Sequence, residues 1–310
     1  MRVVFMGTPD FAVGTLEAIV AAGHEVALVV TQPDKAQGRS KTLVPTAVKA
    51  CAIKYDLPVF QPTRIRNEDA VEMVRQAKPD VIVVVAFGQI IPKEILDMAP
   101  YGCLNVHASL LPAYRGAAPI QWAVLNGDKE SGVTIMRMDE GLDTGDMISK
   151  VVVPLDKKET SESLFDKLAA AGAKLLVDTL PSVAEGTAVY EKQPEESTTA
   201  YAGMIQKQMG QIDWNKSAVE LERLVRGMNS WPSAYTKLDG KTLKVWDSYV
   251  KEEEQTGVAG KILSADKNGI CVQTGKGVLV IEELQLEGKK RMTADAFLRG
   301  YTIRQEVLGA

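Results

Sequence analysis

Asn105 and His107 have side chains suited to chemistry on a carbonyl carbon. They stand two positions apart, so in an extended strand both side chains project from the same face. An amide can donate to a developing oxyanion, and an imidazole can transfer a proton. If only these two residues are considered, there is a competing interpretation: the end of a strand with one isolated histidine, followed by an ordinary surface loop.

The residues that follow His107 predict a loop of defined shape, because a proline fixes one backbone dihedral and removes a donor. Ser109 is close enough to be considered as a nucleophile, although no nucleophile elbow surrounds it. Cys103 shares the predicted face of the strand and is better explained as a small buried apolar residue. The loop itself reads Ser109-Leu110-Leu111-Pro112, and Gly116 closes it.

Residues 139–146 contain four carboxylates and two glycines. They predict a solvated turn, a metal loop, or a ligand loop in which one aspartate turns toward His107. The spacing of an EF-hand is absent, which disfavours calcium. If Asp143 is the inward carboxylate, the site has an oxyanion donor and a proton shuttle but no protein nucleophile. Such a site fits direct acyl transfer between two bound substrates.

The elements that must position these residues predict an α/β fold with a Rossmann-like, mostly parallel sheet. Residues 2–6 read as a buried strand before a glycine, and 25–31 as a second strand after a helix. The run 81–86 is continuous, β-branched and uncharged, as in a strand buried on both faces. Further strands are expected at 104–107, 132–138 and 148–154. Open α/β sheets bind ligands at the carboxyl edge, where Phe87, Gly88 and Gln89 follow the central strand.

The second half of the chain has a different pattern. A polar stretch interrupts the periodicity, after which Ser217 and Glu220 form a capping box and short Val-, Ile- and Leu-rich segments alternate with glycine turns. By analogy, this pattern predicts a small OB-like β-barrel, a fold often used on oligonucleotides. We therefore expect an N-terminal catalytic domain at 1–188, a linker at 189–208 and a C-terminal domain at 209–310.

Composition excludes several classes of protein. The 310 residues include three dispersed cysteines (Cys51, Cys103, Cys271) and two histidines, which disfavours a disulfide framework and a zinc site. No apolar run of membrane length and no signal peptide is visible, so we expect a cytoplasmic protein. The net charge of −4 divides into +1 from residue 209 onward and −5 before it, which permits a nucleic-acid role for the C-terminal part.

Several separated motifs occur in order along the chain: Gly7-Thr8-Pro9-Asp10-Phe11, Asn105-x-His107 with Ser109-Leu110-Leu111-Pro112, Leu142-Asp143-x-Gly145, and Trp231-Pro232. Together these motifs resemble the folate-dependent formyltransferases. The resemblance, together with a second β domain, narrows to members that act on initiator methionyl-tRNA. It implies transfer of the formyl group from 10-formyltetrahydrofolate, a co-substrate, to the α-amino group of the methionine for translation initiation, with no metal.

The same resemblance implies roles for particular residues. Asn105, His107 and Asp143 match the catalytic trio of the family. Ser109 to Pro112 matches a folate-contacting loop, and Phe87-Gly88-Gln89 would line the pterin pocket. Segment 32–42 matches an insertion that engages the tRNA acceptor stem through Arg39 and Lys41, and Lys207 is the one lysine at 204–208, a stretch richer in lysine in the family. A bacterial, monomeric protein is expected.

Three alternatives are weighed against this interpretation. A formyltransferase acting on a sugar-nucleotide or another small amine would share the trio and the folate loop but would not need the C-terminal domain. A nicotinamide-dependent dehydrogenase is disfavoured because the first βαβ unit lacks G-x-G-x-x-G. A non-catalytic RNA-binding protein with a decayed enzyme domain is disfavoured because the trio is intact.

Overall fold

The computed structural model describes residues 1–37, 42–251 and 257–309. The chain forms two compact units, the first made of residues 1–119, 130–154 and 165–202 and the second of 120–129, 155–164 and 203–310. The units interleave along the sequence, because two short segments before residue 165 belong to the second unit. The predicted division into a domain at 1–188, a linker at 189–208 and a domain at 209–310 stays a prediction.

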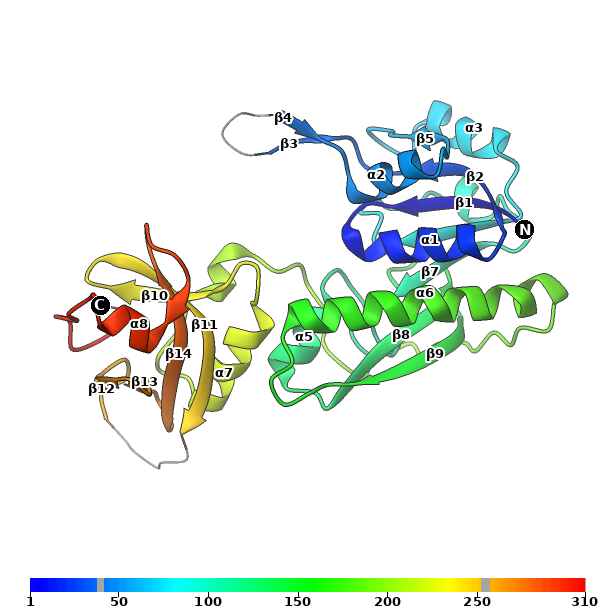
Figure 1. The fold of residues 1–310 in the computed structure, drawn as a ribbon. Coiled ribbons are helices and arrows are strands. Elements are labelled where there is room, and N and C mark those ends of the chain that lie inside the picture. Colours follow the sequence, from blue (N-terminus) through cyan, green and yellow to red (C-terminus); the bar gives the residue numbers. More distant parts are fainter. Residues whose placement is uncertain (38–41, 252–256, 310) are drawn as a thin grey trace. The chain divides into compact units, whose positions relative to one another are not determined.

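The first unit is built on a seven-stranded sheet in the order β5-β2-β1-β6-β7-β8-β9 (Figure 1). The first five strands of this order pair in parallel and the last two pair antiparallel, which confirms the mostly parallel sheet expected from the sequence. Every residue of β6 is buried, as its β-branched, uncharged sequence predicts. The strands are β1 (Arg2–Gly7), β2 (Glu25–Val30), β5 (Val59–Phe60), β6 (Val81–Val85), β7 (Cys103–His107), β8 (Glu130–Arg137) and β9 (Met147–Pro154).

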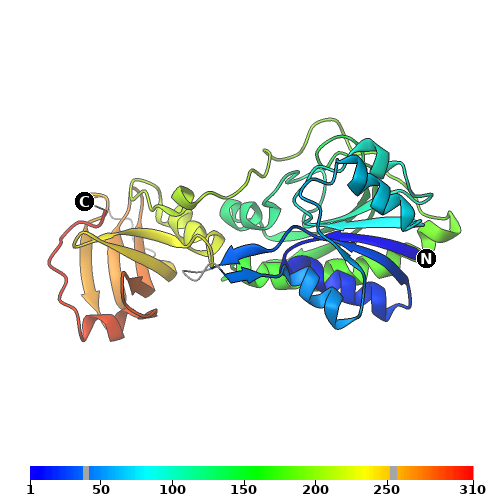
Figure 2. The same cartoon turned by 90° about the horizontal axis from the view of Figure 1, so that it is seen from above.

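Helices cover both faces of this sheet (Figure 2). On one face Cys103 packs in a core with side chains of α3 (Glu68–Gln76) and α4 (Lys93–Leu96). On the other face Gly172 of α6 (Ser161–Glu185) lies against Val106 and Val133, and Phe165 meets Phe11 edge-on at 5.2 Å. Since side chains alternate along a strand, Asn105 and His107 lie on the face opposite α6. The remaining helical elements are η1 (Asp10–Ala12), α1 (Val13–Ala21) and α2 (Ala47–Lys54).

The carboxyl ends of β1 and β6 are tied to each other. The Thr8 hydroxyl, just after β1, donates to the Phe87 carbonyl, just after β6, at 2.9 Å, and the Gln32 amide donates to the same carbonyl at 3.2 Å. These neighbouring strands lie where the strand order reverses, the position at which open α/β sheets bind ligands. These hydrogen bonds hold the two strand ends together where the sequence predicts a ligand.

The polar segment after β2 forms a hairpin that projects from the first unit (Figure 1). Its strands β3 (Lys35–Gln37) and β4 (Thr42–Val44) pair antiparallel, with Lys35 opposite Val44. Leu43 is 66 % exposed on it. Arg39 and Lys41, expected from the resemblance to bind tRNA, lie outside the described residues.

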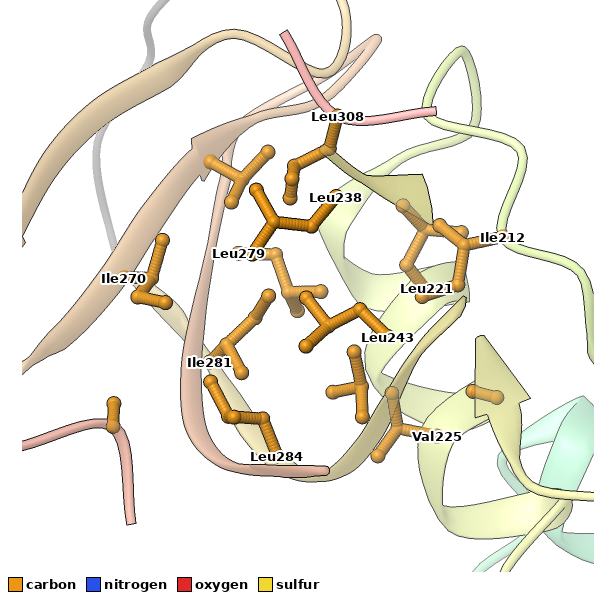
Figure 3. Packing of buried hydrophobic residues seen from close by; sticks show 14 of the residues in the cluster. Ile212, Leu221, Val225, Leu238, Leu243, Ile270, Leu279, Ile281, Leu284 and Leu308 are labelled. Atoms are coloured by element: carbon orange, nitrogen blue, oxygen red, sulfur yellow. The ribbon is translucent and has the colours of Figure 1, made fainter. Parts of the chain in front are cut away.

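The second unit contains an antiparallel sheet in the order β10-β11-β14-β13-β12, with β15 paired to β14. Its inner face carries Leu243, Leu279 and Ile281, which pack with Leu221 and Val225 of the amphipathic helix α7 (Figure 3). The elements are η2 (Lys207–Gly210), α7 (Ala218–Gly227), β10 (Ala234–Leu238), β11 (Lys241–Lys251), β12 (Ile262–Asp266), β13 (Gly269–Gln273), β14 (Val278–Leu286), β15 (Met292–Thr293) and α8 (Ala294–Leu298).

Helix α7 begins at the predicted capping box. The Ser217 side chain accepts from the Glu220 N–H at 3.3 Å, and the Glu220 carboxylate accepts from the Ser217 N–H at 2.9 Å. The C-terminal part of α7 holds the two early segments of the unit: Arg223 donates to the carbonyl of Asn126, which ends α5 (Pro119–Asn126), at 3.1 Å. The Ser161 hydroxyl donates to the Gly227 carbonyl at 2.7 Å.

No helix in the ranges 1–37, 42–251 and 257–309 is long and apolar enough to cross a membrane.

Candidate active site

The structure brings Asn105, His107 and Asp143 together. The Asp143 carboxylate oxygen Oδ1 lies 3.4 Å from the Asn105 amide nitrogen and 3.7 Å from His107 Nδ1. Asn105 and His107 are 9 % and 6 % exposed, so the three groups interact with little competition from water. An amide, an imidazole and a carboxylate therefore meet on one face of β7.

Asp143 reaches this face from an unexpected direction. Because β8 is antiparallel to β7, Arg137 at the end of β8 lies opposite Leu104 rather than beside His107. The loop 138–146 therefore leaves the sheet near the amino-terminal part of β7. It brings Asp143 over the side chains of Asn105 and His107, so the trio lies on the face of the strand and not beyond its carboxyl end.

The backbone of Asp143 is left-handed, with φ of +55°. That conformation is uncommon for residues other than glycine, and such residues cluster at functional sites. The Gly116 N–H donates to the second carboxylate oxygen, Oδ2, at 2.9 Å. One oxygen of Asp143 is thereby anchored, and the other faces the amide and the imidazole.

The tautomer of His107 follows from its second ring nitrogen. His107 Nε2 lies 3.1 Å from the Tyr114 carbonyl oxygen. A carbonyl can only accept, so this hydrogen bond assigns a proton to Nε2. Nδ1, which faces Asp143, is then the atom that can gain or release a proton.

Ser109 has a structural role in the loop. It is fully buried, and its hydroxyl donates to the Ala113 carbonyl at 2.6 Å. Its own carbonyl accepts from the Thr134 hydroxyl at 2.7 Å, and that hydroxyl in turn accepts from the Leu111 N–H at 3.1 Å. The geometry disfavours Ser109 as a nucleophile, because its hydroxyl is committed to the backbone.

The residues expected to contact folate differ in exposure. Phe87, Ser109 and Leu111 are buried, whereas Leu110 and Pro112 are partly exposed and Gly88 is exposed. Gln89 is half-buried, and its side-chain oxygen accepts from the Ile65 N–H at 2.7 Å. Of these residues, Leu110, Pro112 and Gly88 therefore offer the exposed surface that a ligand could contact.

Two large apolar side chains next to predicted site residues in the sequence are exposed, and sequence reasoning assigned neither of them a contact. Ile90 follows Gln89 and is 90 % exposed, and Leu142 precedes Asp143 and is 59 % exposed. An exposed large apolar residue carries information when it adjoins a functional site. Leu142 is the one apolar residue in an otherwise polar, glycine-containing loop, whereas Ile90 lies among apolar residues and has no such signal.

The other acidic residues of the loop 138–146 do not converge on a metal. Asp139 accepts from the Thr144 hydroxyl at 2.8 Å and from the Gly141 N–H at 3.0 Å, which stabilises the turn. Across the described part of the chain, no group of three or more His, Cys, Asp and Glu residues is placed to hold a metal ion. Cys103, below the trio, is fully buried, and burial raises the pKa of its thiol to about 12.

The segment before residue 203, expected to be a linker, lies along the loop 109–116, which we call the active-site loop. The Thr199 hydroxyl accepts from the Tyr114 N–H at 2.7 Å, and the Ala202 N–H donates to the Arg115 carbonyl at 2.9 Å. The Ser197 hydroxyl donates to the Pro112 carbonyl at 2.6 Å. We name residues 193–202 the strap. Sequence reasoning missed its contacts with the site.

The second unit carries an aromatic and cationic cluster. Two cations lie close to the Trp246 ring, with Lys244 Nζ 5.5 Å and the Arg291 guanidinium carbon 4.9 Å from its centroid. Lys244 and Trp246 sit on β11, and Arg291 lies beside β15 and pairs with Glu283. Lys207, in η2, is exposed. Aromatic rings beside cations are typical of surfaces that bind single-stranded nucleic acid.

Comparison with known proteins agrees with this geometry. A formyl transferase family model matches residues 1–180, and a model of the formyl transferase C-terminal domain matches residues 204–302. The methionyl-tRNA formyltransferase of Agathobacter rectalis is 59 % identical over 98 % of both chains, and that of Lachnospira eligens is 56 % identical over 99 % of both.

Two solved structures share the fold at low identity. WlaRD, a sugar 3N-formyl transferase solved in the presence of dTDP and 5-N-formyl-THF, is 20 % identical with a TM-score of 0.66, over 94 % of this chain and 99 % of that one. HypX from Aquifex aeolicus in complex with tetrahydrofolic acid is 19 % identical with a TM-score of 0.63, over 97 % of this chain and 47 % of that one. With two family models covering most of its length and relatives above 50 % identity, this chain belongs to the methionyl-tRNA formyltransferase family.

Proposed function

We propose that this protein transfers the formyl group of 10-formyltetrahydrofolate to the α-amino group of methionine on initiator methionyl-tRNA, for translation initiation. The observation that carries the proposal is the convergence of Asn105 and His107 on Asp143 in a chain so similar to methionyl-tRNA formyltransferases along its whole length. In this proposal the protein works as a monomer in the bacterial cytoplasm, where translation begins.

Asn105 is the proposed oxyanion donor. The methionine amine attacks the formyl carbon, a C–N bond forms, and the formyl oxygen becomes an oxyanion. An amide nitrogen has two protons. One faces Asp143 Oδ1 at 3.4 Å, which orients the group and leaves the second N–H for the oxyanion.

His107 is the proposed proton carrier. Its Nε2 proton is held by the Tyr114 carbonyl, so Nδ1 accepts the proton that the attacking nitrogen loses. Asp143 Oδ1, 3.7 Å away, stabilises the imidazolium that forms. The oxyanion then re-forms the C=O bond as the bond from this carbon to the folate nitrogen N10 breaks. N10 takes the proton from His107, which leaves tetrahydrofolate and the formylated amine.

The donor is proposed to bind beside the trio, with its pterin ring at the edge formed by Phe87, Gly88 and Gln89. A pterin has flat apolar faces and a polar rim, which suits an edge where an exposed apolar side chain, Ile90, follows the exposed backbone of Gly88. Ile90 and Leu142 would cover the faces of the ring. The loop Ser109-Leu110-Leu111-Pro112 would contact the folate through the exposed parts of Leu110 and Pro112.

The tRNA is proposed to bind through cationic groups on both units. Arg39 and Lys41 are the proposed contacts on the segment between β3 and β4. Lys207 and the cluster around Trp246 are the proposed contacts of the second unit, because lysine and arginine neutralise phosphates, and the partly exposed Trp246 ring is proposed to stack on a base.

One assay tests the function. The purified full-length protein is given 10-formyltetrahydrofolate with either charged initiator methionyl-tRNA or a dTDP-amino sugar, and the formylated product is measured by mass spectrometry. Uncharged initiator tRNA is the matched control, because it lacks the amine. We expect formyl-methionyl-tRNA from the first acceptor alone. Formylation of the sugar in preference to the tRNA would establish the alternative activity, and no product from either would contradict the proposal.

A further inference from the structure

Gln193, at the start of the strap, grips the turn that contains Asp143. Its side-chain nitrogen donates to the Asp143 carbonyl at 2.9 Å and to the Gly145 carbonyl at 2.7 Å. Gln193 is 6 % exposed, so water does not compete for these two hydrogen bonds. One side-chain amide therefore fixes the backbone at two points of this turn, at Asp143 and at Gly145. The carboxylate of Asp143 is the one that faces His107.

Arg115 in turn fixes the orientation of the Gln193 amide. The Arg115 Nε–H donates to the Gln193 side-chain oxygen at 3.0 Å. This contact requires the oxygen of the amide to face Arg115 and its nitrogen to face Asp143. The guanidinium also donates to the carbonyls of Pro194 and Glu195, at 2.7 and 3.0 Å, so it is anchored to the strap.

Asp143 is thus held at two points that are far apart in the sequence. Gly116 anchors its side chain from the loop after β7, and Gln193 anchors its backbone from the strap. The left-handed backbone of Asp143 needs such support, because non-glycine residues persist there only when their surroundings impose it. A hydrogen-bonded, buried network of this kind specifies one geometry.

We propose that Gln193, oriented by Arg115, is a positioning residue for the reaction: it sets the place of the Asp143 carboxylate relative to Asn105 and His107. The inference rests on the proposed function, because it assigns Gln193 an effect through Asp143 on formyl transfer. Gln193 touches neither substrate in this account, so its loss lowers the turnover number and leaves folate affinity unchanged.

The variant Gln193→Glu isolates the donor. It keeps the shape of the side chain and an oxygen toward Arg115, but it places an oxygen against the carbonyls of Asp143 and Gly145. Displacing a catalytic group by about 1 Å can cost on the order of 100-fold, so we expect kcat to fall about 10- to 100-fold. The dissociation constant for the folate, measured by fluorescence titration, should stay within about threefold of the wild-type value, the spread that ordinary context effects allow. Gln76→Glu, on exposed α3, adds the same charge to the same unit and is the matched control.

A double-mutant cycle distinguishes positioning from a general structural role. Gln193→Glu is combined with Asp143→Asn, and kcat is measured for both single variants and the double variant, each normalised to its folate-binding fraction. If Gln193 acts through Asp143, the double variant is no slower than Asp143→Asn alone, because residues that act as a unit are not additive. Multiplicative losses, or an unchanged kcat in Gln193→Glu, would overturn the inference.

The wild-type assay separates this test from the test of the function. If the wild-type protein does not formylate methionyl-tRNA, the proposed function fails. If the wild-type protein does so and Gln193→Glu matches Gln76→Glu, only the positioning role fails. Should Gln193→Glu not fold, Gln193→Met removes both donors without adding a charge, and the same cycle with Asp143→Asn applies with the same two outcomes.

Discussion

Replacing Gly116 by alanine should damage the site through the backbone. Gly116 has φ of +127°, a region that L side chains rarely adopt, and its N–H anchors the Asp143 carboxylate at 2.9 Å. A Cβ added there would lie 2.5 Å from the Tyr201 ring and 2.6 Å from the Ala202 carbonyl oxygen. The ring can shift, but the carbonyl is backbone of the strap. The alanine must therefore push the strap away from the active-site loop.

The magnitude follows from two costs. A non-glycine residue in a sparsely populated backbone region costs about 1–3 kcal/mol. Overpacking against atoms that cannot relax adds about 1–3 kcal/mol. Gly186→Ala is the matched control, because Gly186 also has a positive φ, +70°, but nothing lies within 4 Å of its added Cβ. Both variants stiffen the unfolded chain equally, so the difference between them reports the clash with the strap together with the added backbone strain at φ of +127°.

Urea unfolding gives the free energy of unfolding of both variants, and steady-state formylation gives kcat. We expect Gly116→Ala to lose at least about 1 kcal/mol more stability than Gly186→Ala, the lower bound of the overpacking cost. The kcat of Gly116→Ala should also fall about 10-fold or more, because the displaced backbone moves the N–H that holds the Asp143 carboxylate. Gly186→Ala should keep the wild-type kcat. Equal stabilities for the two variants, together with full activity in Gly116→Ala, would refute the role of Gly116.

Three further results are expected. Ser109→Ala should keep kcat within about threefold and lose about 1 kcal/mol of stability in urea unfolding, because a buried loop carbonyl loses its donor; a collapse of kcat would restore Ser109 as a nucleophile. Burial raises the pKa of the Cys103 thiol to about 12, whereas the unfolded thiol titrates near its usual value of 9.0. The stability that the buried neutral thiol contributes is therefore complete below pH 9 and is lost as the pH rises toward 12. Between pH 8 and 10 the wild-type protein should therefore lose more free energy of unfolding than Cys103→Ala does. Equal losses would contradict the burial effect. Lys244→Ala and Arg291→Ala should each weaken tRNA binding with a shallower salt dependence, and salt slopes equal to the wild-type slope would exclude the Trp246 cluster from the tRNA interface.

The sequence predicts the features that depend on local pattern. Alternation placed Asn105 and His107 on one face of a strand, and the run 81–85 is a strand buried on both faces. The capping box of α7 also formed as predicted, because its two residues are close in the chain and satisfy each other. Asp143 was identified by chemistry and resemblance, and the structure supplies the contact that spacing alone could not.

The features that depend on long-range pairing were missed. Gln193 reads as one polar residue in a polar stretch, and only the fold shows that it is buried against Asp143 and Arg115. The polar segment after β2 forms a hairpin in the structure. The sequence did not predict this pairing, because the segment lacks a recognisable two-residue turn. The segments 120–129 and 155–164 belong to the second unit and contact α7. The periodicity of these two segments does not predict those contacts.

The most direct test of the mechanism is single-turnover formylation by Asn105→Ala with saturating 10-formyltetrahydrofolate and initiator methionyl-tRNA. Loss of one oxyanion donor typically costs on the order of 10²–10³ in rate. We predict a loss of that size with folate affinity retained, because Asn105 acts on the oxyanion and not on the bound donor. A single-turnover rate equal to that of the wild-type protein would contradict the account.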